Sequence, residues 1–290
     1  MTRLFGFIQF DLAGALAVAD GRYLVRDGKH EQVLVIETLG AAPPARRRRR
    51  RPRNAEVSEP PPELPVARAT VVLAFNELND EQVAAAWLQE TSSDEGAVDQ
   101  LVERGIAELN KALHTQAVVS GDPYPQTVTP ARAVAIRIGY GGGEALADGA
   151  YSAARQVDPG LGPISRRRQR DEELRPQQRL AAVLGGREQL DACEALLLRA
   201  RADLDGGRER EAALQLRVGI EALLVDLRGA LSDPGHEEDM AALASRRHEL
   251  GELANAALQD NLSPEQLQSL DELLALAERV LRRRRVLGSD

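Results

Sequence analysis

Apolar residues in the C-terminal third of the chain recur with the spacing of α-helices. Three rows step by three and four positions and begin at Leu190, Ala213 and Leu267, and a fourth row begins at Leu243. This spacing places one apolar stripe along each helix. The joins between the rows are short and contain glycine and proline, so neighbouring helices should run antiparallel. The pattern predicts an all-α bundle of about four antiparallel helices over residues 186–290.

Near the N-terminus, apolar and polar residues alternate instead. The even-numbered positions from Ile8 to Leu12 are apolar, whereas Gln9 and Asp11 are polar. Alternation with a period of two is typical of a strand that is buried on one face only. The pattern predicts a half-buried strand over residues 4–12.

The pattern of this strand recurs 128 residues later in the chain. The shift places Ile8 on Ile136 and Tyr23 on Tyr151, and an Ala-Asp-Gly sequence comes after both segments. Because the shift is even, it preserves which face of the strand is apolar. We therefore expect residues 132–140 to form a second strand with its even-numbered side chains in the core, and the two tyrosine rings to pack inward at equivalent places. Chance similarity in a chain rich in alanine and glycine is the alternative.

Other segments of the first 157 residues predict a mixture of strands and helices. Shorter strands are expected at 23–26, 32–38, 70–75 and 116–119, and helices at 79–91 (capped by Asn79) and 96–114. The glycine-rich segment 139–143 is expected to form a turn, because it lacks the nucleotide-binding fingerprints. Residues 1–157 are therefore interpreted as one mixed α/β domain, and the fold class of the chain as α+β.

Two segments rich in proline, glycine or arginine interrupt these parts. Residues 41–65 contain seven prolines and seven arginines, and this composition opposes helix and sheet formation. We expect a disordered linker inserted in the first domain. Residues 158–185 carry a second arginine run and are expected to form a basic connector before the bundle. The arginines of the two runs are the candidate anion-binding or partner-binding residues: Arg46, Arg47, Arg48, Arg49, Arg50, Arg51, Arg53, Arg166, Arg167, Arg168 and Arg170.

The distribution of charge weighs against nucleic acid as the main ligand. The chain has a net charge of −8; residues 66–157 carry 12 acidic and 6 basic side chains, and residues 186–281 carry 20 and 10. Acidic surfaces repel phosphate. Aromatic residues, on which proteins that bind single strands stack bases, make up only 3% of the chain. The arginine runs keep a nucleic-acid-binding accessory factor as the alternative function.

Residues 4–19 share features with a secretory leader, namely a charged start, an apolar run and an Ala-Val-Ala site. However, Gln9 and Asp11 interrupt the run, and its pattern recurs in the middle of the chain. A retained strand is therefore favoured. No other segment approaches the ~20 uncharged apolar residues of a membrane span. We expect a cytoplasmic protein that does not enter a membrane.

Residues with catalytic or metal-binding chemistry form no recognisable motif. The four histidines lack metal-ligand spacing. Cys193 lies on an apolar helical row, where a buried structural thiol is expected. We assign no catalytic residue, no metal site and no cofactor. An enzymatic or ligand-binding α+β domain stays an alternative, because general acids and bases need no local motif.

These observations favour a non-catalytic protein-interaction or scaffold protein. In this interpretation, the surface of the helical bundle binds a protein partner or a second copy of the chain, because amphipathic helices offer faces for such contacts. The nucleic-acid alternative would use the arginine runs instead.

Overall fold

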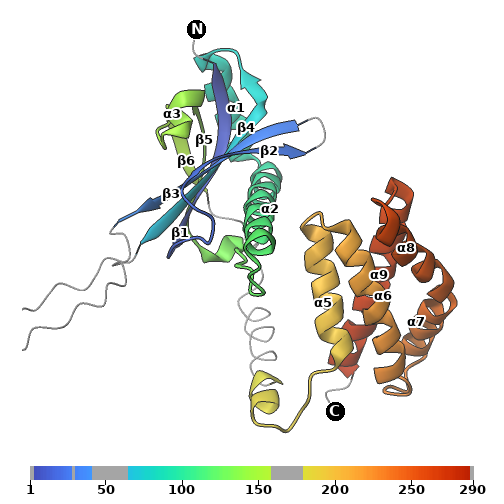
Figure 1. Ribbon diagram of the computed structural model, residues 1–290. Coiled ribbons are helices and arrows are strands. Elements are labelled where there is room, and N and C mark those ends of the chain that lie inside the picture. Colours follow the sequence, from blue (N-terminus) through green and yellow to red (C-terminus); the bar gives the residue numbers. More distant parts are fainter. Residues whose placement is uncertain (1–2, 28–29, 41–64, 158–178, 288–290) are drawn as a thin grey trace, which may run out of the picture. The chain divides into compact units, whose positions relative to one another are not determined.

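The computed structural model describes residues 3–27, 30–40, 65–157 and 179–287. The chain divides into two compact units, residues 1–162 and 163–290. The first unit combines a β-sheet with helices, whereas the described elements of the second unit are helices (Figure 1). The architecture is therefore broadly α+β, as the sequence predicts.

The first unit is built on a six-stranded antiparallel sheet with the strand order β2-β3-β4-β1-β5-β6. The strands are β1 (Leu4–Ala13), β2 (Gly21–Asp27), β3 (His30–Leu39), β4 (Val66–Leu78), β5 (Ala133–Gly142) and β6 (Ala153–Val157). Every strand predicted from the alternation is present, apart from the one expected at 116–119. β1 lies inside the sheet, between β4 and β5.

β1 and β5, the two strands related by the 128-residue shift, are neighbours in this sheet. They pair antiparallel, with Ile8 opposite Ile138 and Phe10 opposite Ile136. All four side chains are buried in one hydrophobic cluster. The prediction that both strands bury their even-numbered residues on the same face is therefore confirmed for residues 8–12 and 136–140. It fails at Val134, which is 66% exposed, where the register of the two strands shifts.

The two tyrosines of the shifted pattern do not occupy equivalent places. Tyr23 lies on the edge strand β2 and donates its hydroxyl to the carbonyl of Ala19 (2.7 Å), whereas the ring of Tyr151 lies 5.5 Å from that of Phe7. Both residues are partly exposed (36% and 43%) rather than packed inward, so this expectation is wrong. After β1 the chain crosses to the far edge of the sheet, but after β5 it returns in the adjacent strand. The similarity is thus confined to the two strands and does not extend to the connections after them.

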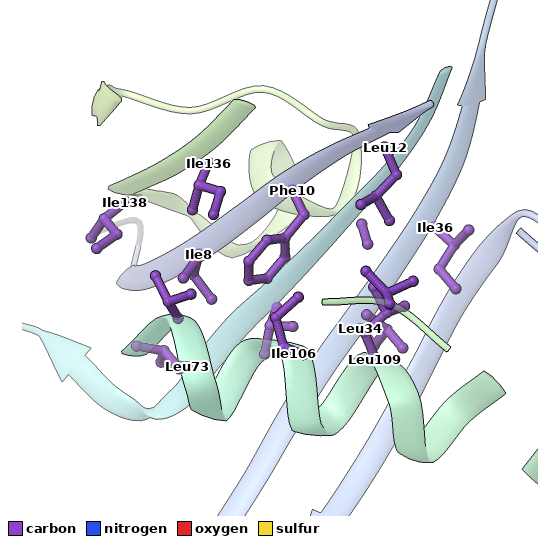
Figure 2. Packing of buried hydrophobic residues seen from close by; sticks show 14 of the residues in the cluster. Ile8, Phe10, Leu12, Leu34, Ile36, Leu73, Ile106, Leu109, Ile136 and Ile138 are labelled. Atoms are coloured by element: carbon purple, nitrogen blue, oxygen red, sulfur yellow. The ribbon is translucent and has the colours of Figure 1, made fainter. Parts of the chain in front are cut away.

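Helices α1 (Glu81–Ser93) and α2 (Glu95–Ser120) cover the apolar face of the sheet. α2 approaches the sheet closely at Gly105, where an added Cβ would lie 2.8 Å from the side chains of Ile8 and Phe10. Side chains of the sheet and of α2 form the hydrophobic core between them. Figure 2 labels ten of these residues: Ile8, Phe10, Leu12, Leu34, Ile36, Leu73, Ile106, Leu109, Ile136 and Ile138.

The helix boundaries differ from the expected ones in two places. α1 is capped by Asp80, whose carboxylate accepts a hydrogen bond from the amide of Val83 (2.8 Å), and not by Asn79. α2 continues through residues 116–119, which were expected to form a strand, and ends at Gly121 in the left-handed conformation (φ 68°). The valines in this stretch favour a strand, but hydrogen bonding continues along the helix until a glycine permits the helical cap.

The glycine-rich segment 139–143 is not a turn, because its first four residues belong to β5 and Gly143 begins the short helix α3 (Gly143–Ala147). A Cβ at Gly139 would lie 2.3 Å from the carbonyl oxygen of Ala153 and 2.8 Å from the ring of Phe7. Glycine at this position therefore allows β6 and Phe7 to approach β5. The glycines serve close packing of the sheet rather than chain reversal.

The described part of the second unit contains five named helices in place of the four predicted. They are α5 (Ala192–Asp205), α6 (Glu209–Asp226), α7 (Pro234–Ser245), α8 (Arg247–Gln259) and α9 (Pro264–Leu287). The apolar row beginning at Leu243 crosses from α7 to α8, and Arg246 separates the two helices. Apolar periodicity does not reveal such a break, because the row continues across it. A four-helix bundle is therefore not confirmed.

Two glycines inside helices, Gly105 of α2 and Gly251 of α8, should respond oppositely to alanine. Gly105→Ala should lower the free energy of unfolding of the first unit by about 1–2 kcal/mol, because the clash with Ile8 and Phe10 outweighs the gain in helix propensity. The fluorescence of Trp87, the only tryptophan, reports this unit. Gly251→Ala meets no atom within 4 Å and should stabilise the second unit by about 0.5–1 kcal/mol, measured by circular dichroism. Equal effects of the two changes would contradict the close packing of α2 on the sheet.

Ile220 and Arg217 test the core of the helical unit. Ile220 is fully buried among the helices, whereas Arg217 is exposed on the same helix. Ile220→Asp buries an unpaired charge and should cost about 4 kcal/mol or more, with loss of cooperative unfolding followed by circular dichroism. Arg217→Asp should change the free energy of unfolding by no more than about 0.5 kcal/mol. Small effects at both positions would show that α6 does not bury this face.

Candidate functional site

The arginine runs that the sequence singled out, residues 46–53 and 166–170, lie outside the described residues. The prediction that they bind an anion or a partner therefore stays a prediction. So does the interpretation of residues 41–65 as a disordered linker, since only Pro65 of that segment is described.

A buried cluster of polar side chains lies on the face of the sheet opposite α1 and α2. The Asp11 carboxylate on β1 accepts hydrogen bonds from Nε of Arg68 on β4 (2.8 Å) and from Nη1 of Arg137 on β5 (2.6 Å). Gln9, two residues before Asp11, donates to the hydroxyl of Thr70 on β4 (3.0 Å). The cluster thus joins the three adjacent strands β4, β1 and β5 through their side chains.

This cluster corrects the expectation that β1 is buried on one face only. Gln9 and Asp11 are buried, as are the apolar residues between which they alternate. Further along the same face, Phe7 packs with Val72 of β4 and with Leu146 of α3 in a small second hydrophobic cluster. α3 therefore covers part of the face of the sheet that carries Phe7, although the alternation in the sequence predicts that this face is exposed to solvent.

Two guanidinium groups face the single carboxylate of this cluster. Burial alone opposes ionisation of Asp11, but the hydrogen bonds and positive charges of Arg68 and Arg137 outweigh it and hold the pKa of Asp11 below its usual value. Hydrogen bonding to Asp11 raises the pKa of Arg68 in turn. A carboxylate held ionised between two guanidinium groups is a poor proton acceptor. The arrangement is suited to joining strands, and we assign it no catalytic role.

Sequence reasoning found two members of the cluster, Gln9 and Asp11, only as interruptions of an apolar run. Arg68 and Arg137 were not singled out, because they lie 57 and 126 residues from Asp11. The signal in the sequence was weak: each arginine alternates with apolar residues in or beside a segment expected to be a strand. Only the register of β1 with β4 and β5 brings the three together.

The expectation that Cys193 is a buried thiol is confirmed. Cys193 is fully buried in the helical core, where burial, with a smaller contribution from nearby Asp226 and Asp191, raises the pKa of its thiol to about 12. Such a thiol is protonated at neutral pH and unsuited to nucleophilic attack. Within the described ranges, no three His, Cys, Asp or Glu side chains are grouped so that they could hold a metal ion.

Helix α6 presents apolar side chains on two opposite faces. Leu216, Ile220 and Leu223 are fully buried in the helical core. Val218 and Val225, which lie seven residues apart and hence on one face of the helix, are 55% and 69% exposed. An apolar face of this kind on a helix whose other face fills a core is a candidate interaction surface.

α8 extends this surface beside α6. The Arg210 guanidinium at the start of α6 donates to the carbonyl oxygens of Ala257 (2.6 Å) and Leu258 (3.2 Å) at the end of α8. Glu221 of α6 accepts a hydrogen bond from Nε of Arg247 at the start of α8 (2.9 Å). These two contacts hold the helices side by side and antiparallel. We call the partly exposed Leu214 and the exposed Val218 and Val225 of α6, together with the exposed Leu258 at the end of the neighbouring α8, the α6–α8 surface.

None of the described helices combines the length and the apolar character that crossing a bilayer requires. Comparison of the chain with protein-family models, with curated proteins and with solved structures found no match. The surfaces of the two units are therefore the basis on which a function is proposed below.

The pairing of Asp11 predicts how the first unit responds to acid. Asp11→Asn should lower its free energy of unfolding at pH 7 by about 2 kcal/mol, because two partly buried guanidinium groups lose their counter-ion. The pKa of Asp11 is lowered by folding, so its contribution is complete above about pH 4 and is lost as the pH falls through the folded-state value. The difference between wild type and variant, followed by Trp87 fluorescence, should therefore shrink below about pH 4. A difference that stays constant down to about pH 2 would contradict the pairing.

Proposed function

We propose that this chain is a cytoplasmic, non-catalytic protein-interaction or scaffold protein, and that the α6–α8 surface of its helical bundle binds a protein partner. The observation that carries the proposal is the exposure of Val218 and Val225 on a helix whose opposite face is fully buried. The two exposed valines lie on one face of the helix, and apolar patches on a protein surface are common at interaction sites.

The spacing of these side chains suggests the form of the partner. Val218 and Val225 are two helical turns apart, so they line one ridge along α6. An amphipathic helix laid along this ridge could place apolar residues at the same spacing against it. Glu211, Arg217 and Glu221 border the ridge. Their mixed charges would select the orientation of a bound helix more than its affinity.

Nucleic-acid binding is the second candidate function, favoured by seven arginines within the eight positions from Arg46 to Arg53. Phosphate contacts by all seven would give a logarithmic salt dependence of binding with a slope of roughly −6 on duplex DNA. A binding titration at several salt concentrations therefore separates this candidate from binding through an apolar helix face, which salt weakens little.

Site-specific photo-crosslinking tests the proposed surface. A benzophenone amino acid placed at position 218 should give a discrete adduct with one protein after irradiation in the native host, and nuclease treatment should not remove the adduct. The matched control is the same amino acid at Val83, an exposed valine on α1 of the other unit, which should give no such adduct. An adduct of twice the chain mass would identify the partner as a second copy.

A charge substitution completes the test. Val225→Asp should abolish the adduct formed from position 218 and leave the circular dichroism of the chain unchanged, because an exposed position tolerates charge. Adducts of the same pattern from positions 218 and 83, or an adduct that survives Val225→Asp, would contradict the proposal.

A further inference from the structure

The edge of β2 is a second surface with interaction chemistry, and it belongs to the other unit. β2 is the first strand in the sheet order and pairs only with β3. In the described ranges of the chain, no other segment hydrogen-bonds to its outer edge. An edge strand presents alternate N–H and C=O groups outward, and these can pair with another extended chain.

The side chains of β2 leave this edge accessible. Leu24, in the middle of the strand, is 53% exposed, and Arg22, Tyr23 and Arg26 are exposed as well. Because strand side chains alternate, Arg22, Leu24 and Arg26 share one face of the sheet. That face therefore carries the pattern basic, apolar, basic along the edge.

Both arginines already have exposed acidic neighbours, but these contacts leave them available. Arg22 pairs with Asp148, and Nε of Arg26 lies 3.1 Å from Glu31 on β3. All four side chains are more than half exposed. Ion pairs at such positions are weak and screened by salt. An acidic side chain arriving on the open side of either arginine would add a second partner.

The same charges oppose pairing of β2 with a second copy of itself. The antiparallel arrangement that overlaps the whole strand is centred on Leu24. It places Arg22 of each copy directly opposite Arg26 of the other. Like charges in directly opposite positions destabilise a strand pair, and charged edge residues commonly prevent association of sheet edges. The charges on β2 therefore disfavour a second copy of β2 and favour an acidic strand at its outer edge.

We propose that the outer edge of β2 binds an acidic, extended segment of a partner protein, which adds to the sheet as a strand next to β2. Main-chain hydrogen bonds supply the affinity in this mode of recognition, and side chains at alternate positions supply the specificity. The segment carries acidic residues opposite Arg22 and Arg26 and an apolar residue opposite Leu24. This inference does not rest on the α6–α8 surface.

A symmetric peptide provides the test on the full chain. The sequence Ser-Glu-Thr-Val-Thr-Glu-Ser has the required pattern in either strand direction. Fluorescence anisotropy of the labelled peptide should show saturable binding below about 1 mM. Hydrogen exchange should slow at the amides of residues 21–27 when the peptide is bound, because outward N–H groups gain acceptors.

Two control peptides separate strand addition from attraction to any basic part of the chain. The counterpart with lysine in place of both glutamates should not bind, since it meets Arg22 and Arg26 with like charge. The acidic peptide N-methylated at its three central residues keeps its charge, but the methyl groups block the close approach that strand pairing needs, so it should not slow exchange in residues 21–27. The exposed pair Arg22→Gln and Arg26→Gln should weaken binding about fivefold, whereas Arg217→Gln on α6 should leave it unchanged.

Four results would overturn the proposal. They are absence of binding by the acidic peptide, equal binding of the acidic and basic peptides, equal protection of residues 21–27 by the N-methylated peptide, and concentration-dependent self-association of the chain that the acidic peptide reverses. The last result would assign the edge to a second copy.

Discussion

The first unit depends on the burial of β1 on both of its faces. β1 is flanked by β4 and β5, so both edges of its backbone are paired within the sheet. A carboxylate in such a strand is stable only when its charge is compensated, and Arg68 and Arg137 supply that compensation from the two neighbouring strands. The pairing of Asp11 with Arg68 and Arg137 also favours the observed register. A shift of β4 or β5 by one residue would carry its arginine to the opposite face of the sheet. With this face closed by polar contacts and α3, the other face is left to the apolar contacts with α1 and α2.

In the helical unit, arginine ion pairs and hydrogen bonds lie between helices instead of inside a sheet. Its arginines connect helices at their margins: Arg201 of α5 donates to Glu278 of α9 (2.8 Å), and Arg210 of α6 donates to the last carbonyls of α8. These contacts hold the helices around a core of leucine and alanine. They leave the outer valines of α6, Val218 and Val225, 55% and 69% exposed. The first unit thus covers both faces of its strand β1 internally, whereas helix α6 of the second unit buries one face and exposes Val218 and Val225 on the other.

Much of the local structure was predictable from periodicity, and the errors have identifiable physical causes. The rows of apolar residues located the helical segments, and alternation located β1, β3 and β5. Local propensity failed at residues 116–119, where valines lie in a helix that Gly121 ends. It also failed at Gly139, which serves close approach of Phe7 and β6. In both cases, contacts or caps outside the predicted segment decided its conformation.

The candidate surfaces were less predictable than the elements that carry them. Val218 and Val225 resemble core positions in the sequence, because exposure depends on which side of α6 the other helices occupy. Likewise, Arg22 and Arg26 become candidate binding residues only when β2 is known to be an edge strand.

By itself, the sequence determined where the chain forms most of its strands and helices, which face of β1 and of β5 is apolar, and that Cys193 belongs to a helical core. These properties depend on side-chain spacing, which is local. Only the tertiary structure decided that Asp11 meets Arg68 and Arg137, that β2 lies at an edge, and that one face of α6 stays uncovered. These properties depend on contacts between segments tens of residues apart, whose register and neighbours no local pattern specifies.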